Sequence, residues 1–282
     1  IQSFEEIRKK GYLYVDKTDI IWQLANRDRK YNYLNRPRRF GKSVLVDTLQ
    51  AYFEGRKELF EGLKIMDLET EWTKHPVIRL DMSRAGSSAH ELNAYLNQAF
   101  KEYEQKFSIE ASPANTFSNR FDTIIQSANQ QTGQQVVVLV EGYDSPLLNS
   151  WNTPHHEECV SIYLNVFTIL KADDEYEEFV LITGTTKFTK LSLLNNLSNI
   201  SFEPEYAAIC GITKEELQND FKPEIEKLAD YENWTFDEAV AQLQAHYGGY
   251  HFSRKNMVDV FNPFSLIKAL SLTKIDNYWD SS

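Results

Sequence analysis

Residues 34–43, which read Leu-Asn-Arg-Pro-Arg-Arg-Phe-Gly-Lys-Ser, limit the possible folds of this chain more than any other segment. Residues 30–34 lead into it with alternating aromatic and polar side chains, as a strand does. Residues 44–53 follow it with apolar side chains on one helical face. Between a strand and a helix, a Gly-Lys-Ser loop wraps an anion so that backbone N–H groups point at it. The segment therefore predicts an α/β fold with a phosphate-binding loop.

The loop differs from the usual G-x-x-x-x-G-K-[ST] pattern at its first position, where Arg36 stands in place of glycine. Pro37 also removes one N–H donor. The alternative interpretation is a Gly-Lys-Ser helix cap beside a basic surface loop. However, residues 27–42 carry seven basic side chains and one acidic one, in a chain whose net charge is −11. This local concentration of positive charge favours an anion site.

In such a site, the Lys42 ammonium reaches the β- and γ-phosphates of a nucleotide, and the Ser43 hydroxyl ligates Mg²⁺. Arg38 and Arg39 are expected to clamp phosphates or face a neighbouring subunit; alternatively, one of them pairs with a carboxylate such as Asp144. The expected nucleotide contacts are the loop and the start of the helix: Arg36, Pro37, Arg38, Arg39, Phe40, Gly41, Lys42, Ser43 and Val44.

Four strands, expected at residues 30–34, 76–81, 136–140 and 179–184, alternate along the chain with helices. The helices are expected at residues 44–54, 88–107, 117–130 and 157–171. This order predicts a parallel sheet with right-handed crossovers, whose ligands bind at the carboxyl ends of the strands. The polar residues at or just beyond those ends are Ser43, Asp81, Glu141, Asp144 and Thr183.

The pattern of buried strands fades after residue 199, and the rest of the chain is expected to be mostly helical. Thr213 and Glu216 have the spacing of a capping box at the start of the first of these helices. Helices are expected at residues 213–229, 235–246 and 263–272. The predicted domains are an α/β core at residues 1–199 and a helical, lid-like subdomain at residues 200–282.

Composition excludes some classes of protein. A pI near 5.1 argues against a surface that coats nucleic acid. Two isolated cysteines make no disulfide framework, and no signal peptide or long apolar run occurs, so a cytoplasmic protein with no membrane contact is expected. His155, His156 and Cys159 superficially resemble a metal cluster. No second pair of ligands with suitable spacing accompanies them, so a solvated helix start is expected there.

The chain resembles the bacterial AAA-ATPase-like family, whose P-loop ATPase domain is often followed by a PD-(D/E)XK nuclease-like domain. The loop Arg-Pro-Arg-Arg-Phe-Gly-Lys-Ser is typical of that family. The other resembling segments are residues 14–18, 52–55, 143–147, 183–184, 187–188, 210–213, 247–250, 262–265 and 277–279. The resemblance implies a P-loop NTPase fold of the AAA+/ASCE type, with ATP and Mg²⁺ as cofactors. It also implies a nuclease-like domain beyond residue 279, through which nucleic acid becomes a possible partner.

One segment departs from the family pattern. The family has Asp-Glu-Tyr-Asp after its third strand, and this chain has Glu141-Gly142-Tyr143-Asp144. The resemblance implies that the first acid, here Glu141, holds Mg²⁺ with Ser43, and that the second acid polarises the attacking water. Gly142 has no side chain for that task. Asp144 is a candidate to replace the missing acid if the strand continues, because residues two apart share a face; Glu141 is the other candidate, and neither replacement is the favoured outcome.

Thr183 matches the place where related ATPases keep a polar residue that senses the γ-phosphate; a threonine that merely ends a strand is the alternative. The expected catalytic residues are Lys42, Glu141, Asp144 and Thr183. The leading hypothesis is an ATP- and Mg²⁺-binding module with weak or absent hydrolysis that acts as a nucleotide-dependent switch. The alternatives are an active ATPase that uses Asp144 or Glu141, and a module whose basic loop binds nucleic acid. The base preference and the oligomeric state stay open.

Overall fold

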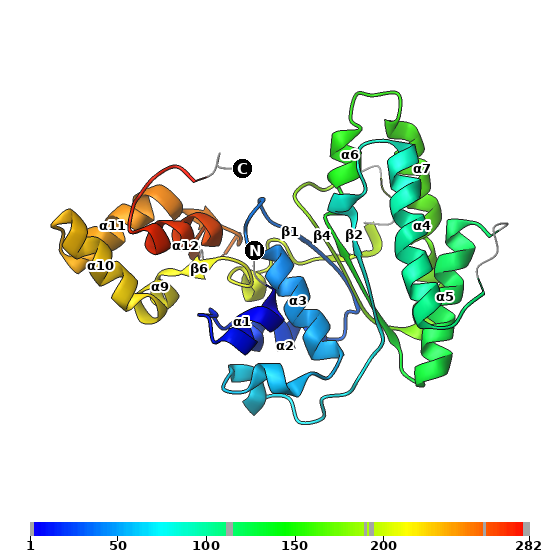
Figure 1. Cartoon of the computed structure of the whole chain (residues 1–282), viewed down its shortest axis with the longest axis horizontal. Coiled ribbons are helices and arrows are strands. Elements are labelled where there is room, and N and C mark those ends of the chain that lie inside the picture. The colour runs from blue at the N-terminus through cyan, green and yellow to red at the C-terminus, as the bar shows by residue number, and fades with distance from the viewer. Residues whose placement is uncertain (1–2, 111–114, 189–190, 192–194, 256–257, 279–282) are drawn as a thin grey trace.

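The computed structural model describes residues 3–110, 115–188, 191, 195–255 and 258–278. At its centre lies a five-stranded parallel sheet with the strand order β2-β3-β4-β1-β5 (Figure 1). The strands are β1 (Tyr31–Asn35), β2 (Val77–Asp81), β3 (Val136–Glu141), β4 (Glu177–Gly184) and β5 (Ser198–Asn199). The predicted parallel α/β sheet is confirmed, and β5 is a strand that the sequence did not predict.

Helices cover both faces of this sheet, which explains why its central strands β3 and β4 contain uninterrupted runs of apolar residues. Val137 and Leu139 of β3 pack into the core beneath α1, α2 and α3, whereas Val136, Val138 and Val140 pack beneath α4, α5 and α7 (Figure 1). The helices of this part are α1 (Phe4–Lys10), α2 (Thr18–Asn26), α3 (Lys42–Phe53), α4 (Ala89–Lys106), α5 (Phe117–Thr132), α6 (Ser145–Asn149), α7 (His156–Phe167) and α8 (Ile169–Ala172). The short 3₁₀ helices are η1 (Lys57–Phe60), η2 (Lys64–Asp67), η3 (Met82–Arg84), η4 (Asp174–Tyr176) and, beyond β5, η6 (Pro204–Tyr206).

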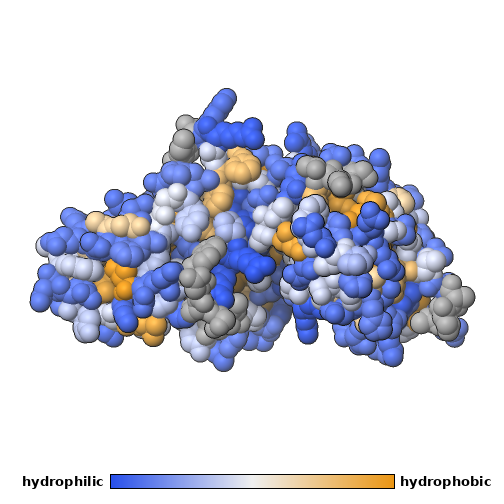
Figure 2. Space-filling model, turned by 90° about the horizontal axis from the view of Figure 1, so that it is seen from above, coloured by the Kyte–Doolittle hydropathy of each residue, from blue (hydrophilic) through white to orange (hydrophobic). Residues whose placement is uncertain are grey.

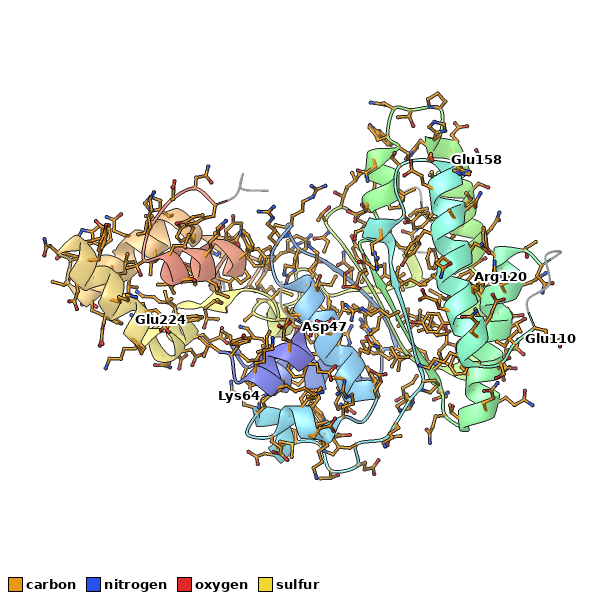
Figure 3. The ribbon with its side chains drawn as sticks, in the orientation of Figure 1. Asp47, Lys64, Glu110, Arg120, Glu158 and Glu224 are labelled. Carbon is orange, nitrogen blue, oxygen red and sulfur yellow. The ribbon has the colours of Figure 1, made fainter. Side chains whose placement is uncertain are left out.

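Arg120 of α5 ties two of these covering helices together (Figure 3). Its guanidinium bonds both carboxylate oxygens of Glu104 on α4, at 2.6 and 3.1 Å, and both residues are buried. A buried arginine is tolerated here because a partner neutralises its charge.

The C-terminal part of the chain forms its own lobe, at the left of Figure 1. Its helices are α9 (Lys214–Asp220), α10 (Lys222–Glu232), α11 (Phe236–Tyr247) and α12 (Pro263–Leu272). The capping box of Thr213 and Glu216 is present at the start of α9. A small antiparallel sheet, ordered β6 (Ile212–Thr213), β8 (Asp259–Phe261) and β7 (Tyr250–His251), joins these helices. The sequence did not predict this sheet.

Seen from above, the molecule presents a mostly hydrophilic surface on which apolar patches are small and scattered (Figure 2). Within the described ranges, no helix combines the length and apolar character that crossing a bilayer requires.

Two buried carboxyl groups lie at the amino end of β4, away from the strand ends where ligands are expected. Glu177 accepts a hydrogen bond from the Tyr31 hydroxyl at 3.0 Å, whereas its Oε2 has no hydrogen-bond partner among the described residues. Burial raises the pKa of Glu177 to about 8. Burial and a hydrogen bond with Asp122 raise the pKa of neighbouring Asp173 to about 7. In the folded chain both groups therefore keep their protons at pH values at which an exposed carboxyl group has already lost its proton.

We expect the free energy of unfolding to fall as the pH rises from about 5 to about 8, because the folded state keeps protons that the unfolded state releases. One such group contributes at most about 1.4 kcal/mol per pH unit. Glu177→Gln should make this slope shallower, and Glu178→Gln, at the adjacent half-buried position, should not. Urea unfolding at several pH values measures the slope; an equal slope in wild type and Glu177→Gln would contradict the assignment.

Candidate functional site

The loop after β1 has the backbone shape of an anion cradle. Arg39 and Gly41 adopt positive φ angles of 60° and 86°, and α3 begins directly after them at Lys42. The first turn of a helix leaves N–H groups without partners inside the helix. Among the described residues, no side chain caps this N-terminus. The loop therefore presents backbone donors and a positive helix end, which together attract an anion.

A cavity of about 380 Å³ lies between this loop and the carboxyl ends of the strands. From the loop and α3, the residues that line it are Arg38, Arg39, Lys42 and Ser43. From the strand ends and the segments that follow them, the polar residues are Asp81, Ser83, Glu141, Asp144, Ser145, Thr183 and Thr185. The cavity falls within the range of small-molecule sites. Segments far apart in the sequence thus bring cations, carboxylates and hydroxyls around one space.

The Lys42 ammonium group is held inside the loop. It donates hydrogen bonds to the carbonyl oxygens of Arg36 and Pro37, both at 2.7 Å. Burial lowers its pKa to about 8, which still leaves it mostly protonated at neutral pH. An ammonium has three donors, so one N–H stays available for a phosphate oxygen.

Two residues of the loop point away from the cavity, although they were expected among the nucleotide contacts. Arg36 is 1% exposed, and its guanidinium donates to the carbonyl oxygens of Ser201 at 2.7 Å and Tyr206 at 3.1 Å. Phe40 is fully buried against the rings of Tyr250 and Phe252. Neither side chain lines the cavity. These two side chains anchor the loop to the C-terminal part of the chain, and a phosphate would meet only the backbone at these positions.

Arg79 of β2 forms a two-point ion pair with the carboxylate of Glu141. Its guanidinium donates to Oε2 at 2.8 Å and to Oε1 at 3.0 Å. The remaining donors reach Asp47 at 2.6 Å and Gln50 at 3.0 Å, both on α3, where Asp47 is labelled in Figure 3. Burial raises the pKa of Glu141, and the hydrogen bond from Arg79 opposes that rise. Glu141 is thus fixed by an internal cation at the end of β3.

Asp144 does not lie on a continuing strand, so the expectation that it shares a face with position 142 is wrong. β3 ends at Glu141, and Gly142 turns the chain with a φ of +57°. Asp144 then accepts three hydrogen bonds on Oδ2, from the N–H and hydroxyl of Thr185 and the N–H of Thr186, at 2.7 to 2.8 Å. Its carboxylate holds the segment after β4 in place.

Thr183 offers a hydroxyl that the fold itself does not use. The residue is 1% exposed and lines the cavity, and its Oγ1 has no hydrogen-bond partner among the described residues. A buried hydroxyl without a partner costs free energy, and a ligand oxygen at this position would remove that cost. The sensing role predicted for Thr183 stays a prediction that this geometry supports.

The polar groups of the cavity fit a polyphosphate. Lys42 has a donor to spare, the helix end is uncapped by any described side chain, and the Thr183 hydroxyl lacks a partner. For Mg²⁺ the expected donors are Ser43, which is exposed at the cavity, and Glu141. Each Glu141 oxygen keeps a second lone pair beside its bond to Arg79. Within the described ranges, no group of three or more His, Cys, Asp or Glu side chains is arranged around a metal site.

The suggested metal cluster at the start of α7 has other contacts. His156 Nδ1 lies 3.2 Å from the Ser150 hydroxyl, His155 is exposed, and Cys159 is buried in the core. None of the three lines the cavity.

Sequence reasoning missed the roles of Arg79 and Ser83, and it placed Asp81 at a strand end without assigning it a task. Arg79 lies inside a strand, two positions before Asp81, where a charged side chain signals only an open strand edge. Ser83 lies in η3, which no sequence pattern marked. Only the pairing of β2 with β3, which sets Asp81 opposite Glu141, brings Asp81 and Ser83 to the cavity and Arg79 within reach of Glu141.

Comparison with known proteins identifies the family of this chain. A protein of Azotobacter chroococcum mcd 1 described as "Uncharacterized protein in vnfD 5′region" is 34% identical over 286 residues. The alignment covers 99% of this chain and 52% of that relative, so the chain spans about half of the relative's length. The family model described as "Predicted AAA-ATPase" matches residues 1–194, which contain the phosphate loop and every strand end that lines the cavity. The chain therefore belongs to the AAA-ATPase-like family of predicted AAA-ATPases.

Proposed function

We propose that this chain binds ATP with Mg²⁺ in the cavity, hydrolyses it slowly, and acts as a nucleotide-dependent regulatory unit. The observation that carries the proposal is the contrast between the two sides of the cavity. On one side Lys42 and Ser43 stand at an uncapped helix end. On the other side Gly142 leaves no acid at the water-activating position. Membership of an AAA-ATPase-like family supports nucleotide binding.

The slow hydrolysis follows from the positions of the two proposed substitutes. Glu141 has both oxygens bonded to Arg79, and Asp144 has one oxygen bonded to three donors. Loss of a general base typically lowers a rate by about 10²- to 10⁴-fold. Ser43 and Glu141 would hold Mg²⁺, which supplies charge neutralisation at the phosphates when bound.

The regulatory part rests on contacts between the loop and the C-terminal lobe. The Arg39 guanidinium lies 4.7 Å from the ring centroid of Phe264, at the start of α12. Phe40 packs on Tyr250 and Phe252, at ring separations of 5.0 and 5.2 Å. A phosphate that orders the loop would therefore act directly on this lobe, as ligand switches do when they fix a segment.

Lys42→Ala tests the site. We expect it to weaken Mg-ATP binding by roughly 10- to 100-fold, because a charged hydrogen bond contributes about 1.5–3 kcal/mol. Titration with Mg-ATP and Mg-GTP, with binding and phosphate release followed together, measures the effect and the base preference. Lys171→Ala, which removes an exposed lysine from the end of α8, is the matched control.

Two results would count against the proposal. Equal binding by wild type and Lys42→Ala would place the nucleotide elsewhere. A wild-type turnover of about 1 s⁻¹ or more lies in the ordinary range of enzymes and would contradict slow hydrolysis. Nucleic-acid binding that depends on salt and survives excess ATP would instead favour the nucleic-acid hypothesis.

A further inference from the structure

The space beside Gly142 is occupied by η3. A Cβ atom built on Gly142 would lie 3.3 Å from both the Cβ and the backbone nitrogen of Ser83. In this chain the side chain of Ser83 in η3 therefore packs tightly against the place where a side chain at position 142 would begin. Ser83 and Gly142 both line the phosphate cavity, so this close approach occurs at the cavity wall.

Ser83 holds a carboxylate in a fixed position. Its hydroxyl donates to Asp81 Oδ1 at 2.6 Å and its N–H donates to the same oxygen at 3.1 Å. The Asp81 backbone N–H is fixed in turn by the Tyr95 hydroxyl at 2.7 Å. Among the described residues, the hydrogen bonds from Ser83 to the Asp81 carboxylate both go to Oδ1, so Oδ2 keeps its lone pairs for another group.

Asp81 lies at the carboxyl end of its strand, the edge of the sheet where a ligand is expected. It is the last residue of β2, and the β2–β3 register pairs it with Glu141. It is half-buried and lines the same cavity as Lys42, Ser43 and Thr183. Glu141 is held by Arg79 and Asp144 by the segment after β4, whereas Asp81 is bonded only to the residues that hold it at this wall.

We propose that Asp81, positioned by Ser83, is the catalytic carboxylate that activates water in this chain and carries its slow hydrolysis, an inference that rests on the proposed binding of ATP. One water proton passes to Asp81 Oδ2 as the water oxygen forms a bond to the γ-phosphorus. The bond between that phosphorus and the β–γ bridging oxygen breaks, and ADP leaves with its electron pair. Asp81 then returns the proton to solvent, and the products are ADP and inorganic phosphate.

Asp81→Asn in the whole chain tests this role, because it keeps the shape and the hydrogen bonds on one oxygen but cannot take a proton. We expect single-turnover phosphate release at saturating Mg-ATP to fall by about 10²-fold or more, as for loss of a general base. The dissociation constant of Mg-ATP should stay the same, since the interaction develops only in the transition state. Glu102→Gln is the control, because Glu102 of α4 lines a separate cavity beside Arg79 and Tyr103 and does not line this one.

Ser83 is a positioning residue and has its own test. Ser83→Ala should lower the release rate less than Asp81→Asn and leave Mg-ATP binding unchanged, and Ser83→Thr, which keeps the hydroxyl, should restore the rate. If Asp81→Asn does not fold, Asp81→Glu replaces it. A carboxylate displaced by one methylene should also lower the release rate without weakening Mg-ATP binding.

The outcomes separate this inference from the proposed function. An unchanged release rate in Asp81→Asn, or in the Asp81→Glu variant that replaces it, overturns the inference. So does a wild-type chain that binds Mg-ATP but releases no phosphate above the uncatalysed rate. A variant that needs more Mg²⁺ for binding overturns it as well, because Asp81 would then be a metal ligand. A wild-type chain that binds no Mg-ATP is a different result, which refutes the proposed function itself.

Discussion

Replacing Arg36 with glycine is expected to lower the free energy of unfolding by about 3–5 kcal/mol, although it restores the usual glycine of a phosphate loop. The Arg36 guanidinium is buried and donates to three backbone carbonyls, those of Asn35, Ser201 and Tyr206. Its centre also lies 4.0 Å from the ring centroid of Phe252. Glycine would leave these acceptors without a partner, and it would make the unfolded chain more flexible. Urea unfolding followed by circular dichroism measures the loss.

Two neighbouring variants sharpen this result. Arg38→Gly removes an exposed arginine from the same loop and should leave the stability almost unchanged. Arg36→Lys keeps the positive charge but loses the fork that reaches separate carbonyls, so we expect a loss between those of the other two variants. If Arg36→Gly unfolds at the same urea concentration as wild type, Arg36 does not hold the loop to the C-terminal lobe.

Arg79→Ala is expected to destabilise the chain by about 3–5 kcal/mol, the range for a buried ion pair that loses one partner. Glu141 is 7% exposed and would keep its charge without a cation, and Asp47 would lose its ion pair as well. Because burial already raises the pKa of Glu141, loss of Arg79 should raise it further. A raised folded pKa adds stability that is lost as the pH rises, so the destabilisation should be larger at pH 8 than at pH 5.

The matched variant for this prediction is Arg79→Ala combined with Glu141→Gln. Removing both charges should recover part of the stability, because a neutral amide costs less to bury than an unpaired carboxylate. A double-mutant cycle of the four proteins gives the coupling energy. Strictly additive losses, or a destabilisation that does not change with pH, would mean that the pair in β2 and β3 contributes little to the fold.

The main sheet and its helices could be predicted because their signals are local. Five consecutive apolar residues at 136–140 predicted β3, and in the structure this strand ends one residue later, at Glu141. The apolar residues that recur at helical spacing after Ser43 likewise predicted α3. The small sheet could not be predicted, because β6 and β7 have two residues each and β6 pairs with β8 across more than forty positions of sequence. Strands of that length have no periodicity to read.

The candidate site was predictable as a list of strand ends but not as a set of partners. The sequence placed Glu141, Asp144 and Thr183 near the loop, and all three line the cavity. It could not reveal that Arg79 holds Glu141 or that the chain turns at Gly142. Those facts depend on strand register and on backbone angles, which one sequence position does not encode. The side chain of Arg36 was misjudged for the same reason, since its partners lie more than 160 positions away.

The burial of Phe40 has a practical consequence for anyone who truncates this protein. Cutting the chain after residue 194, where the family match stops, would delete Tyr250 and Phe252 and expose a large aromatic ring at the centre of the binding loop. It would also delete two of the three carbonyl acceptors of Arg36, those of Ser201 and Tyr206. Recombinant fragments of this kind would tend to aggregate because of the exposed apolar surface, for reasons unrelated to catalysis. If such a fragment showed no nucleotide binding or hydrolysis, that result would therefore say nothing about the activity of the intact chain.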